Sequence, residues 1–460
     1  MYVSELIDRS WLHWREGEAV IIDCQTGKGK THFILNTLKG KILYLYNRIS
    51  LGNQLKGKVK HIDFKSYQKL AAEIKDGNFP KKEYDYVVYD ECHYLFHDSM
   101  FNSEVDYVCR FFHKGGKVNI YMSSTMDNMT GYLKQLFKVV HEYEIPRDYG
   151  YITPYQFECE RLLINTINKS RKKWIIFIDS IARGREFKNL IQDSEFVCSV
   201  YKDGSKANKT ALKQIEKDER FDCKCLIATK ALDNGINIID EEVRNVVIYS
   251  FDKIDFVQML GRVRTFDQLN LYIYKYSTLY PIYLKMAETS DMIHLFNNEY
   301  EEFCRKYNDN VDKVNACVFK VTEDKEEKNW ELIENGFQVF ILKMFQLEHK
   351  VAGLYKDKDW LLKEQLEWIN KDSAESIERN WFLSCLSKYA GRKLFAKEQE
   401  QLTEEIKNNL DTKLRGKKMK EESLLKLLRF YQVPFTFEKG SEIPPKQRRT
   451  KVFWVFEIAK

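Results

Sequence analysis

The sequence predicts an α/β protein with two successive parallel-sheet domains, followed by a mostly α-helical region. Short apolar stretches rich in β-branched and aromatic residues alternate with helix-length segments as far as about Tyr280. Polar motifs follow these strands, as expected where ligands gather at the carboxyl ends of parallel strands. Beyond Tyr280 the pattern changes to long, charged helices. A chain of 460 residues has room for two to four domains, because one core rarely exceeds ~250–300 residues.

Composition excludes several classes of protein. A hydrophobic content of 44% with 14% aromatic residues is typical of a packed globular protein and not of a disordered one. The longest apolar runs have strand length, and the segment 1–7 is no signal peptide, so we expect no membrane partner. Ten cysteines without a CxxC pair argue against a zinc or disulfide framework. A reducing, cytoplasmic location is therefore expected.

The net charge of +6 is unevenly distributed. Between residues 413 and 460, thirteen Lys and Arg stand against five Glu, a net charge of +8, so the rest of the chain sums to −2. This excess predicts a polyanion contact at the C-terminus. A solvated basic tail explains the same charge equally well.

The phosphate-loop candidate is the stretch AVIIDCQTGKGKTHFIL, residues 19–35. A buried strand precedes the loop CQTGKGKT and a helical pattern follows it, which is the context that makes such a loop informative. Gly27 and Gly29 would turn the backbone so that its N–H groups face an anion, assisted by the helix N-terminus. Lys30 would reach the β- and γ-phosphates, and the Thr31 hydroxyl would hold Mg²⁺. A Gly-Lys surface turn is the alternative interpretation, which the flanking strand and helix disfavour.

Four further strands complete the expected first domain. They are predicted at 41–46, before Ser66, at 84–89 and at 118–122. The strand at 84–89 leads directly into Asp90-Glu91-Cys92-His93, and we expect it to lie beside the strand that feeds the phosphate loop. There Asp90 can bind Mg²⁺ through its shell, and Glu91 can accept a proton from the attacking water or orient it.

A second αβ series follows a linker predicted between Ile145-Pro146 and Thr153-Pro154. Its strands are expected at 174–178, 196–200, 225–228, 243–249 and 271–276. No phosphate loop recurs in this half, which indicates a partner domain and not a second nucleotide site.

The rest of the chain predicts helices and a terminal hairpin. Helices are expected at 299–307, 330–347, 360–370, 379–389, 398–410 and 422–431, with a solvated turn at 323–328. Strands at 435–437 and 452–456 flank a basic loop, which gives the outline of a winged helix. An ordinary helix and hairpin packed on the body is the alternative, and it is slightly favoured. The predicted domains are 1–148, 149–280, 281–412 and 413–460.

Taken together, these motifs resemble those of superfamily-two helicases and translocases of the DExH type. CQTGKGKT resembles motif I, Arg48 to Gln54 motif Ia, Asp90-Glu91-Cys92-His93 the DECH form of motif II, and Ser123-Ser124-Thr125 motif III. Phe177 to Ser180 is similar to motif IV, Thr229 to Asn237 to motif V, and Gln258 to Arg264 to motif VI. They occur in the family's order over residues 19–264, a little over half of the chain.

The resemblance implies two RecA-like domains that hydrolyse ATP with Mg²⁺ in the cleft between them. It assigns catalytic roles to Lys30, Asp90, Glu91, Gln258, Arg262 and Arg264. Nucleotide binding would fall to Thr26, Gly27, Lys28, Gly29, Lys30, Thr31, His32, Gly235 and Asn237, and metal binding to Thr31 and Asp90. Contacts to a nucleic-acid backbone would come from Arg48, Gln54, Ser66, Tyr67 and Thr229, and coupling of hydrolysis to the strand from His93, Ser123 and Thr125.

The sequence departs from the family's pattern at three places. Cys24 stands where Gly or Ala is usual, and Thr265 stands where many members carry a second arginine. No glutamine motif for adenine recognition precedes the phosphate loop. Trp11 or Trp14 could stack on a base instead, although a buried aromatic is the commoner role.

The leading hypothesis is an ATP-dependent helicase or translocase, an ATP hydrolase that moves on nucleic acid. DNA is favoured over RNA by the DECH form and the basic end of the chain. The alternative is an ATP-gated protein that clamps nucleic acid or remodels a protein partner without separating strands. In a third interpretation, the helical region 281–412 recruits the motor to a protein partner.

Overall fold

The structure is a computed structural model that describes residues 1–25, 27–47, 61–78, 84–97, 105–109, 111, 117–199, 203–229, 237–264, 268–324, 327–414, 416–443 and 449–459. Its contacts divide the chain into two compact units. The first unit is Met1–Asp148 with Ser277–Leu361, and the second is Tyr149–Tyr276 with Leu362–Lys460. The predicted helical region 281–412 is thus divided between the two units.

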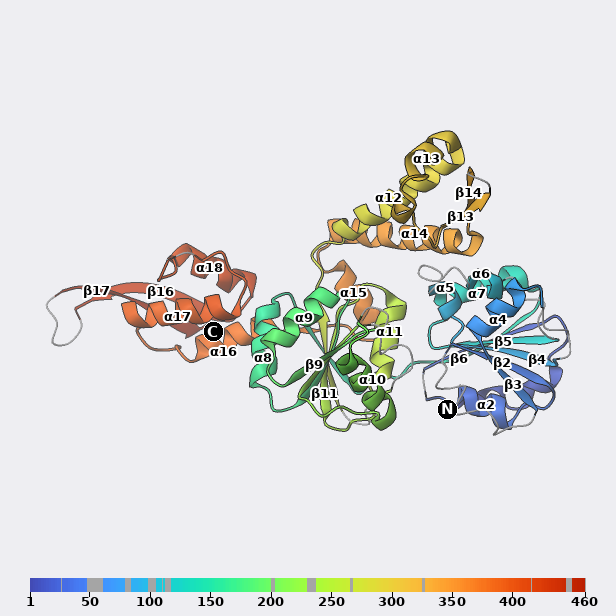
Figure 1. Ribbon diagram of the computed structural model, residues 1–460. Coiled ribbons are helices and arrows are strands. Elements are labelled where there is room, and N and C mark those ends of the chain that lie inside the picture. The colour runs from blue at the N-terminus through green and yellow to red at the C-terminus, as the bar shows by residue number, and fades with distance from the viewer. Residues whose placement is uncertain are drawn as a thin grey trace. The chain divides into compact units, whose positions relative to one another are not determined.

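The first unit contains a six-stranded parallel sheet in the order β3-β2-β4-β5-β1-β6 (Figure 1). Its strands are β1 Ala19–Cys24, β2 Ile42–Tyr46, β3 Ile62–Ser66, β4 Tyr86–Asp90, β5 Val118–Ser123 and β6 Val140–Ile145. The predicted strands are present, but the expected pairing of the strand before Asp90 with the phosphate-loop strand is wrong. β5 lies between β4 and β1, because its residues pair in register with both neighbours.

Each face of this sheet is covered by its own helices, which explains the continuous apolar strands. Alternate residues of the strands point to opposite faces and join two separate hydrophobic clusters. One cluster includes residues of α1 Val3–Ile7 and α2 Lys30–Asn36. The other includes residues of α4 Tyr67–Lys75, α5 Tyr94–His97, α6 Val105–Cys109 and α7 Asp127–Leu136.

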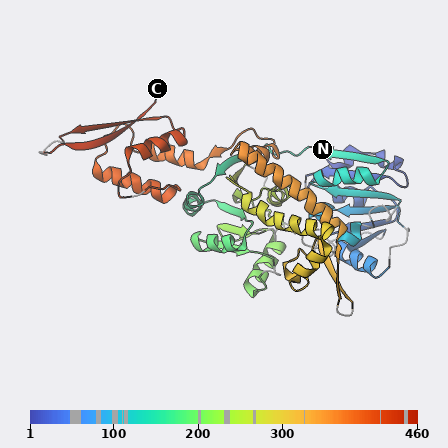
Figure 2. The same ribbon diagram turned by 90° about the horizontal axis from the view of Figure 1, so that it is seen from above.

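The segment 277–361 adds a helical module with its own core to the first unit. Helices α12 and α14 lie side by side (Figure 2), and Asn335 ties the module to α6 by accepting no charge but donating its backbone N–H to Asp106 Oδ1 at 3.2 Å. The elements are α12 Tyr280–Asn298, α13 Tyr300–Tyr307, β13 Phe319–Asp324, β14 Glu327–Leu332 and α14 Glu334–Lys356. The hairpin β13–β14 corrects the prediction of a helix from residue 330, and the charge run at 323–328 spans its turn.

The second unit contains a seven-stranded parallel sheet in the order β15-β7-β12-β11-β8-β10-β9. Its strands are β7 Ile152–Phe157, β8 Lys173–Phe177, β9 Ser194–Val197, β10 Cys225–Ala228, β11 Val243–Ile248, β12 Leu269–Tyr274 and β15 Glu375–Ser376. The end of the predicted linker is therefore a strand, since Pro154 pairs with Leu271. Proline is tolerated there because β7 gains its second neighbour only at Tyr155.

Two hydrophobic clusters also cover the faces of this second sheet. One contains residues of α10 Lys206–Asp218, α11 Lys253–Arg262 and α15 Trp360–Glu367. The other joins α8 Glu160–Lys169 and α9 Ile181–Leu190 to the C-terminal elements α16 Ile377–Ser387, α17 Ala396–Asn409, α18 Glu421–Phe430, β16 Phe435–Glu442 and β17 Lys451–Ile458. The C-terminal helix and antiparallel hairpin thus exist and share a continuous core with the preceding helices.

Among the helices that the structure describes, none combines the length and apolar character that crossing a bilayer requires.

Candidate functional site

The phosphate-loop candidate connects β1 to α2 in the first unit. Gly27 and Gly29 have φ angles of +88° and +84°, in the left-handed region that favours glycine. Val3 donates its backbone N–H to the carbonyl of Lys28 at 3.0 Å, and Tyr2 lies 3.5 Å from the place a Gly29 Cβ would occupy. The two glycines are therefore required by the turn itself, and the N-terminal helix holds one side of the loop.

Lys30 is buried at the beginning of α2. Its Nζ donates to the carbonyl oxygen of Cys24 at 2.7 Å, so the side chain folds back across the loop. Burial raises the pKa of the Cys24 thiol, which stays neutral beside the ammonium group. Cys24 thus serves the loop through its main chain, which any small residue could supply.

A tyrosine hydroxyl connects the two residues that the sequence assigns to a metal. Tyr44 Oη donates to Asp90 Oδ2 at 2.7 Å and lies 3.4 Å from Thr31 Oγ1. Burial and the Asp90 carboxylate raise the pKa of Tyr44 well above its usual range, so the hydroxyl keeps its proton. Hydroxyl and carboxylate oxygens are the donors that Mg²⁺ prefers. The residues present at this place therefore fit a magnesium ion.

Glu91 begins a second chain of contacts at the carboxyl edge of the sheet. Its φ angle of +50° is unusual for a residue with a side chain. Glu91 Oε2 lies 3.4 Å from His93 Nδ1, and this nitrogen lies 2.7 Å from Ser123 Oγ. Ser123 Oγ in turn accepts the backbone N–H of Thr125 at 3.0 Å. The predicted catalytic acid and the three predicted coupling residues thus form one connected path.

Arg147 adds a contact that the motifs do not announce. Its Nη2 lies 3.1 Å from Asp23 Oδ1, and its Nε donates to the carbonyl of Ser124 at 3.2 Å. Burial raises the pKa of Asp23, and the guanidinium of Arg147 opposes that shift. Arg147 therefore ties the segment after β6 to the end of β1 and to the segment after β5.

We expect Arg147→Met to lower the free energy of unfolding by about 2–3 kcal/mol at about pH 8, because it leaves the Asp23 carboxylate buried without its counter-charge. The loss should shrink at about pH 5. Without Arg147 the pKa of Asp23 rises further, so protonation relieves the folded state before the unfolded one. Urea unfolding at both pH values measures this. In an Asp23→Asn background the pH dependence of the loss should vanish, and its persistence would contradict the assignment to Asp23.

In the second unit, the motif VI helix α11 buries both Gln258 and Arg262. Arg262 Nη2 donates to Gln258 Oε1 at 3.0 Å, one helical turn away. Arg262 Nε is buried and has no hydrogen-bond partner among the residues that the structure describes. Ile238 donates to the carbonyl of Arg262 at 2.8 Å and accepts from the N–H of Arg264 at 2.9 Å. The segment after Asn237 is therefore fixed to the end of the helix.

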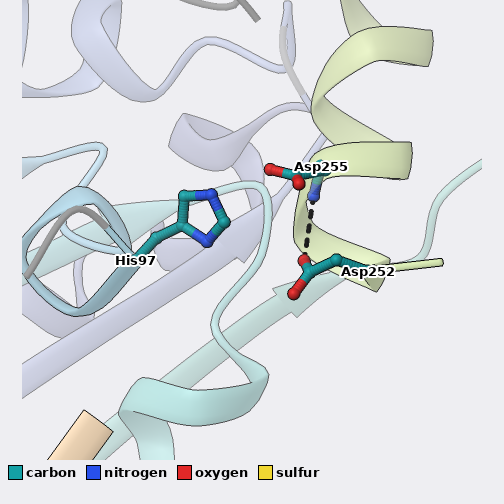
Figure 3. Close-up of side chains that lie close together, drawn as sticks. All are labelled: His97, Asp252 and Asp255. Atoms are coloured by element: carbon teal, nitrogen blue, oxygen red, sulfur yellow. Dashed lines mark hydrogen bonds between the residues drawn. The ribbon is translucent and has the colours of Figure 1, made fainter. Parts of the chain in front are cut away.

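The beginning of α11 is fixed equally well. Asp252 caps it by accepting the backbone N–H groups of Ile254 and Asp255 at 2.9 and 3.2 Å, the second of which Figure 3 shows. Ser250 Oγ accepts the N–H of Asp252 at 3.1 Å. Gln365 of α15 is fully buried and donates to the carbonyl of Ser250 at 2.7 Å. Helix α15 thus positions the helix that carries Arg262.

Several predicted residues lie elsewhere or outside the described part. Tyr67 was expected on a nucleic-acid-binding rim, but its side chain is buried and its hydroxyl donates to the carbonyl of Asp90 at 2.8 Å. Ser66 caps α4 by accepting the N–H of Lys69. Trp14 packs in the core against Phe33, the role described as commoner. Partly exposed residues are His32's neighbour Thr31 and, at the end of β10, Thr229. Thr26, Arg48, Gln54 and Gly235 lie outside the described residues.

Sequence reasoning missed Tyr44, Arg147 and Gln365 as parts of the site. Tyr44 and Asp90 are 46 positions apart, and Gln365 and Ser250 are 115 apart. No local pattern identifies such partners. A polar or phenolic side chain inside an otherwise apolar stretch, as in KILYLY, is the one signal the sequence carries.

Comparisons with known proteins agree with the geometry of the second unit. Residues 158–266 match the family described as helicase conserved C-terminal domain. Curated protein sequences give no match. The matched segment contains Gln258 and Arg262, and it supports an ATP-hydrolysing, nucleic-acid-acting enzyme of the superfamily 2 helicase kind.

Solved structures with similar folds include three helicase-related proteins. S. cerevisiae Dbp5 bound to RNA and ADP BeF3 is 16% identical over 56% of this chain and 78% of its own, with a TM-score of 0.42. A fragment of a putative HsdR subunit of a type I restriction enzyme from Vibrio vulnificus is 16% identical over 58% and 61%, with a TM-score of 0.40. The DUF1998 helicase MrfA bound to DNA is 16% identical over 61% and 47%, with a TM-score of 0.40.

Proposed function

We propose that this chain is an ATP-dependent motor of the DExH type that couples ATP hydrolysis to movement on DNA. The observation that carries the proposal is the meeting of Thr31 and Asp90 on one tyrosine hydroxyl, beside the phosphate loop. Phosphate-binding backbone and metal-binding oxygens are the two features that hydrolysis of a nucleoside triphosphate requires together. The helicase C-terminal domain at 158–266 supports a motor over a simple nucleotide switch.

In this proposal the first unit binds ATP through Gly27, Lys28, Gly29 and Lys30. Mg²⁺ held by Thr31 and Asp90 would neutralise charge on the phosphates. Glu91 accepts the proton of the attacking water, and His93 beside it passes the change in charge to Ser123. Arg262 supplies the positive charge that stabilises the transferring phosphoryl group, with Gln258 holding its guanidinium.

DNA as the track rests on the C-terminal charge of +8 between residues 413 and 460 and on the helix and hairpin found there. A basic surface binds a phosphate backbone without reading bases. The module at 281–412 is proposed to contact a protein partner. The four domains of the sequence analysis remain our proposal for how these tasks are divided.

Steady-state ATP hydrolysis tests the proposal. The rate is measured without polynucleotide, with single-stranded DNA, with duplex DNA and with RNA, and Glu91→Gln provides the blank. We expect DNA to stimulate hydrolysis, with a stimulation that falls as salt rises. Stimulation by RNA alone would replace the track. Hydrolysis indifferent to every polynucleotide would overturn the motor and favour an ATPase that remodels a protein partner.

A further inference from the structure

Tyr44 lies at the centre of the proposed metal site although no motif includes it. Its side chain projects from the middle of β2 into the core and is fully buried, with its ring 5.5 Å from that of Phe64. Only its hydroxyl meets polar groups, at 2.7 Å from Asp90 Oδ2 and 3.4 Å from Thr31 Oγ1. A buried phenol placed between two metal-binding candidates needs an explanation beyond packing.

The hydroxyl can hold both neighbours at once. It has one proton, which goes to the Asp90 carboxylate, the stronger acceptor at the shorter distance. The Thr31 hydroxyl is then the donor at 3.4 Å, because the phenol oxygen retains acceptor capacity. This arrangement fixes the rotation of the carboxylate and keeps the two oxygen-bearing side chains within reach of one another.

A second tyrosine holds the main chain at the same place. Tyr67 Oη donates to the carbonyl oxygen of Asp90 at 2.8 Å, and its ring stacks on Tyr94 with centroids 5.9 Å apart. Backbone and side chain of Asp90 are thus held by separate phenols from β2 and from the beginning of α4. With the backbone fixed by Tyr67, rotation of the carboxylate is controlled by Tyr44.

We propose that Tyr44 is a positioning residue for Mg²⁺, holding Asp90 and Thr31 in the arrangement that receives the ion with its nucleotide. The inference rests on the proposed function, because it concerns the ion of that site. Partners that orient metal-binding side chains commonly change metal affinity by 10- to 100-fold when they are removed. Tyr44 does not touch the reacting atoms, and its effect is therefore on ion binding before it is on chemistry.

Tyr44→Phe tests the inference, since it removes one oxygen and leaves the ring in the core. The matched control is Tyr46→Phe, two residues along the same strand and on the same face. Tyr46 is 4% exposed, and its hydroxyl makes no contact with Asp90 in the described structure. Binding of Mn²⁺ in the presence of ADP is titrated by the loss of the free-ion electron paramagnetic resonance signal. Thermal unfolding of each apo variant shows that it is folded.

We expect Tyr44→Phe to bind Mn²⁺ about tenfold more weakly than wild type, and Tyr46→Phe to bind it equally well. The loss of ATPase activity in Tyr44→Phe should be recovered at high Mg²⁺. Unchanged or tighter Mn²⁺ binding by Tyr44→Phe would overturn the inference and leave the proposed function intact. Absence of ADP-dependent Mn²⁺ binding in the wild type would instead overturn the proposed ATP site itself. Should Tyr44→Phe fail to fold, Tyr44→Met provides the second variant.

Discussion

Glu91→Gln is expected to lower kcat for ATP hydrolysis by about 10²–10⁴-fold and to leave ATP binding nearly unchanged. Glutamine keeps the shape of the side chain but cannot accept the proton of the attacking water, and a positioned base contributes that range. The backbone strain at φ +50° is the same in both proteins, so the fold should tolerate the change. Single-turnover hydrolysis and equilibrium binding of a fluorescent ATP analogue separate the two effects.

Glu18→Gln is the matched control for this prediction. Glu18 also pairs with a histidine, His141, at 2.8 Å, but it lies immediately before β1, at the opposite end of that strand from the phosphate loop. Its substitution should leave kcat within about twofold of wild type. Equal losses in Glu18→Gln and Glu91→Gln would show that removing a carboxylate perturbs the fold generally. Full activity in Glu91→Gln would remove this residue from the mechanism.

Arg262→Ala is expected to lower kcat by about 10³-fold, the lower end of what an arginine at the transferring phosphoryl group contributes. Its guanidinium is buried and oriented by Gln258 at 3.0 Å. Lysine cannot reproduce the planar fork, so Arg262→Lys should recover little of the rate. ATP binding to the first unit should persist in both variants, and the same fluorescent analogue measures it.

Arg171→Ala is the control for Arg262, because it removes an exposed arginine that precedes β8. Thermal unfolding of each variant is recorded alongside, since Arg262 is buried and its truncation leaves a cavity. Arg264→Ala tests the other candidate arginine of motif VI. A rate loss confined to Arg264→Ala would transfer the role from Arg262 to Arg264.

The sequence alone determined the local parts of this protein. The strand at 19–24, the left-handed glycines 27 and 29 and the helix from Lys30 follow from apolar runs and turn stereochemistry, which act over a few neighbouring residues. The alternation of strands and helices was sufficient to predict two parallel sheets. The helicase C-terminal domain at 158–266 agrees with the motifs predicted in that segment.

Only the tertiary structure decided which of these parts meet. It placed β5 between β4 and β1, paired β13 with β14, and divided the helical region between the two units. It also joined Tyr44 to Asp90 and Arg147 to Asp23, across 46 and 124 positions of the chain. Hydrogen-bond partners this distant are chosen by strand order and side-chain reach, and neither is written in the spacing of neighbouring residues. The motifs name the chemistry, and the packing of the sheet determines which side chains hold it in place.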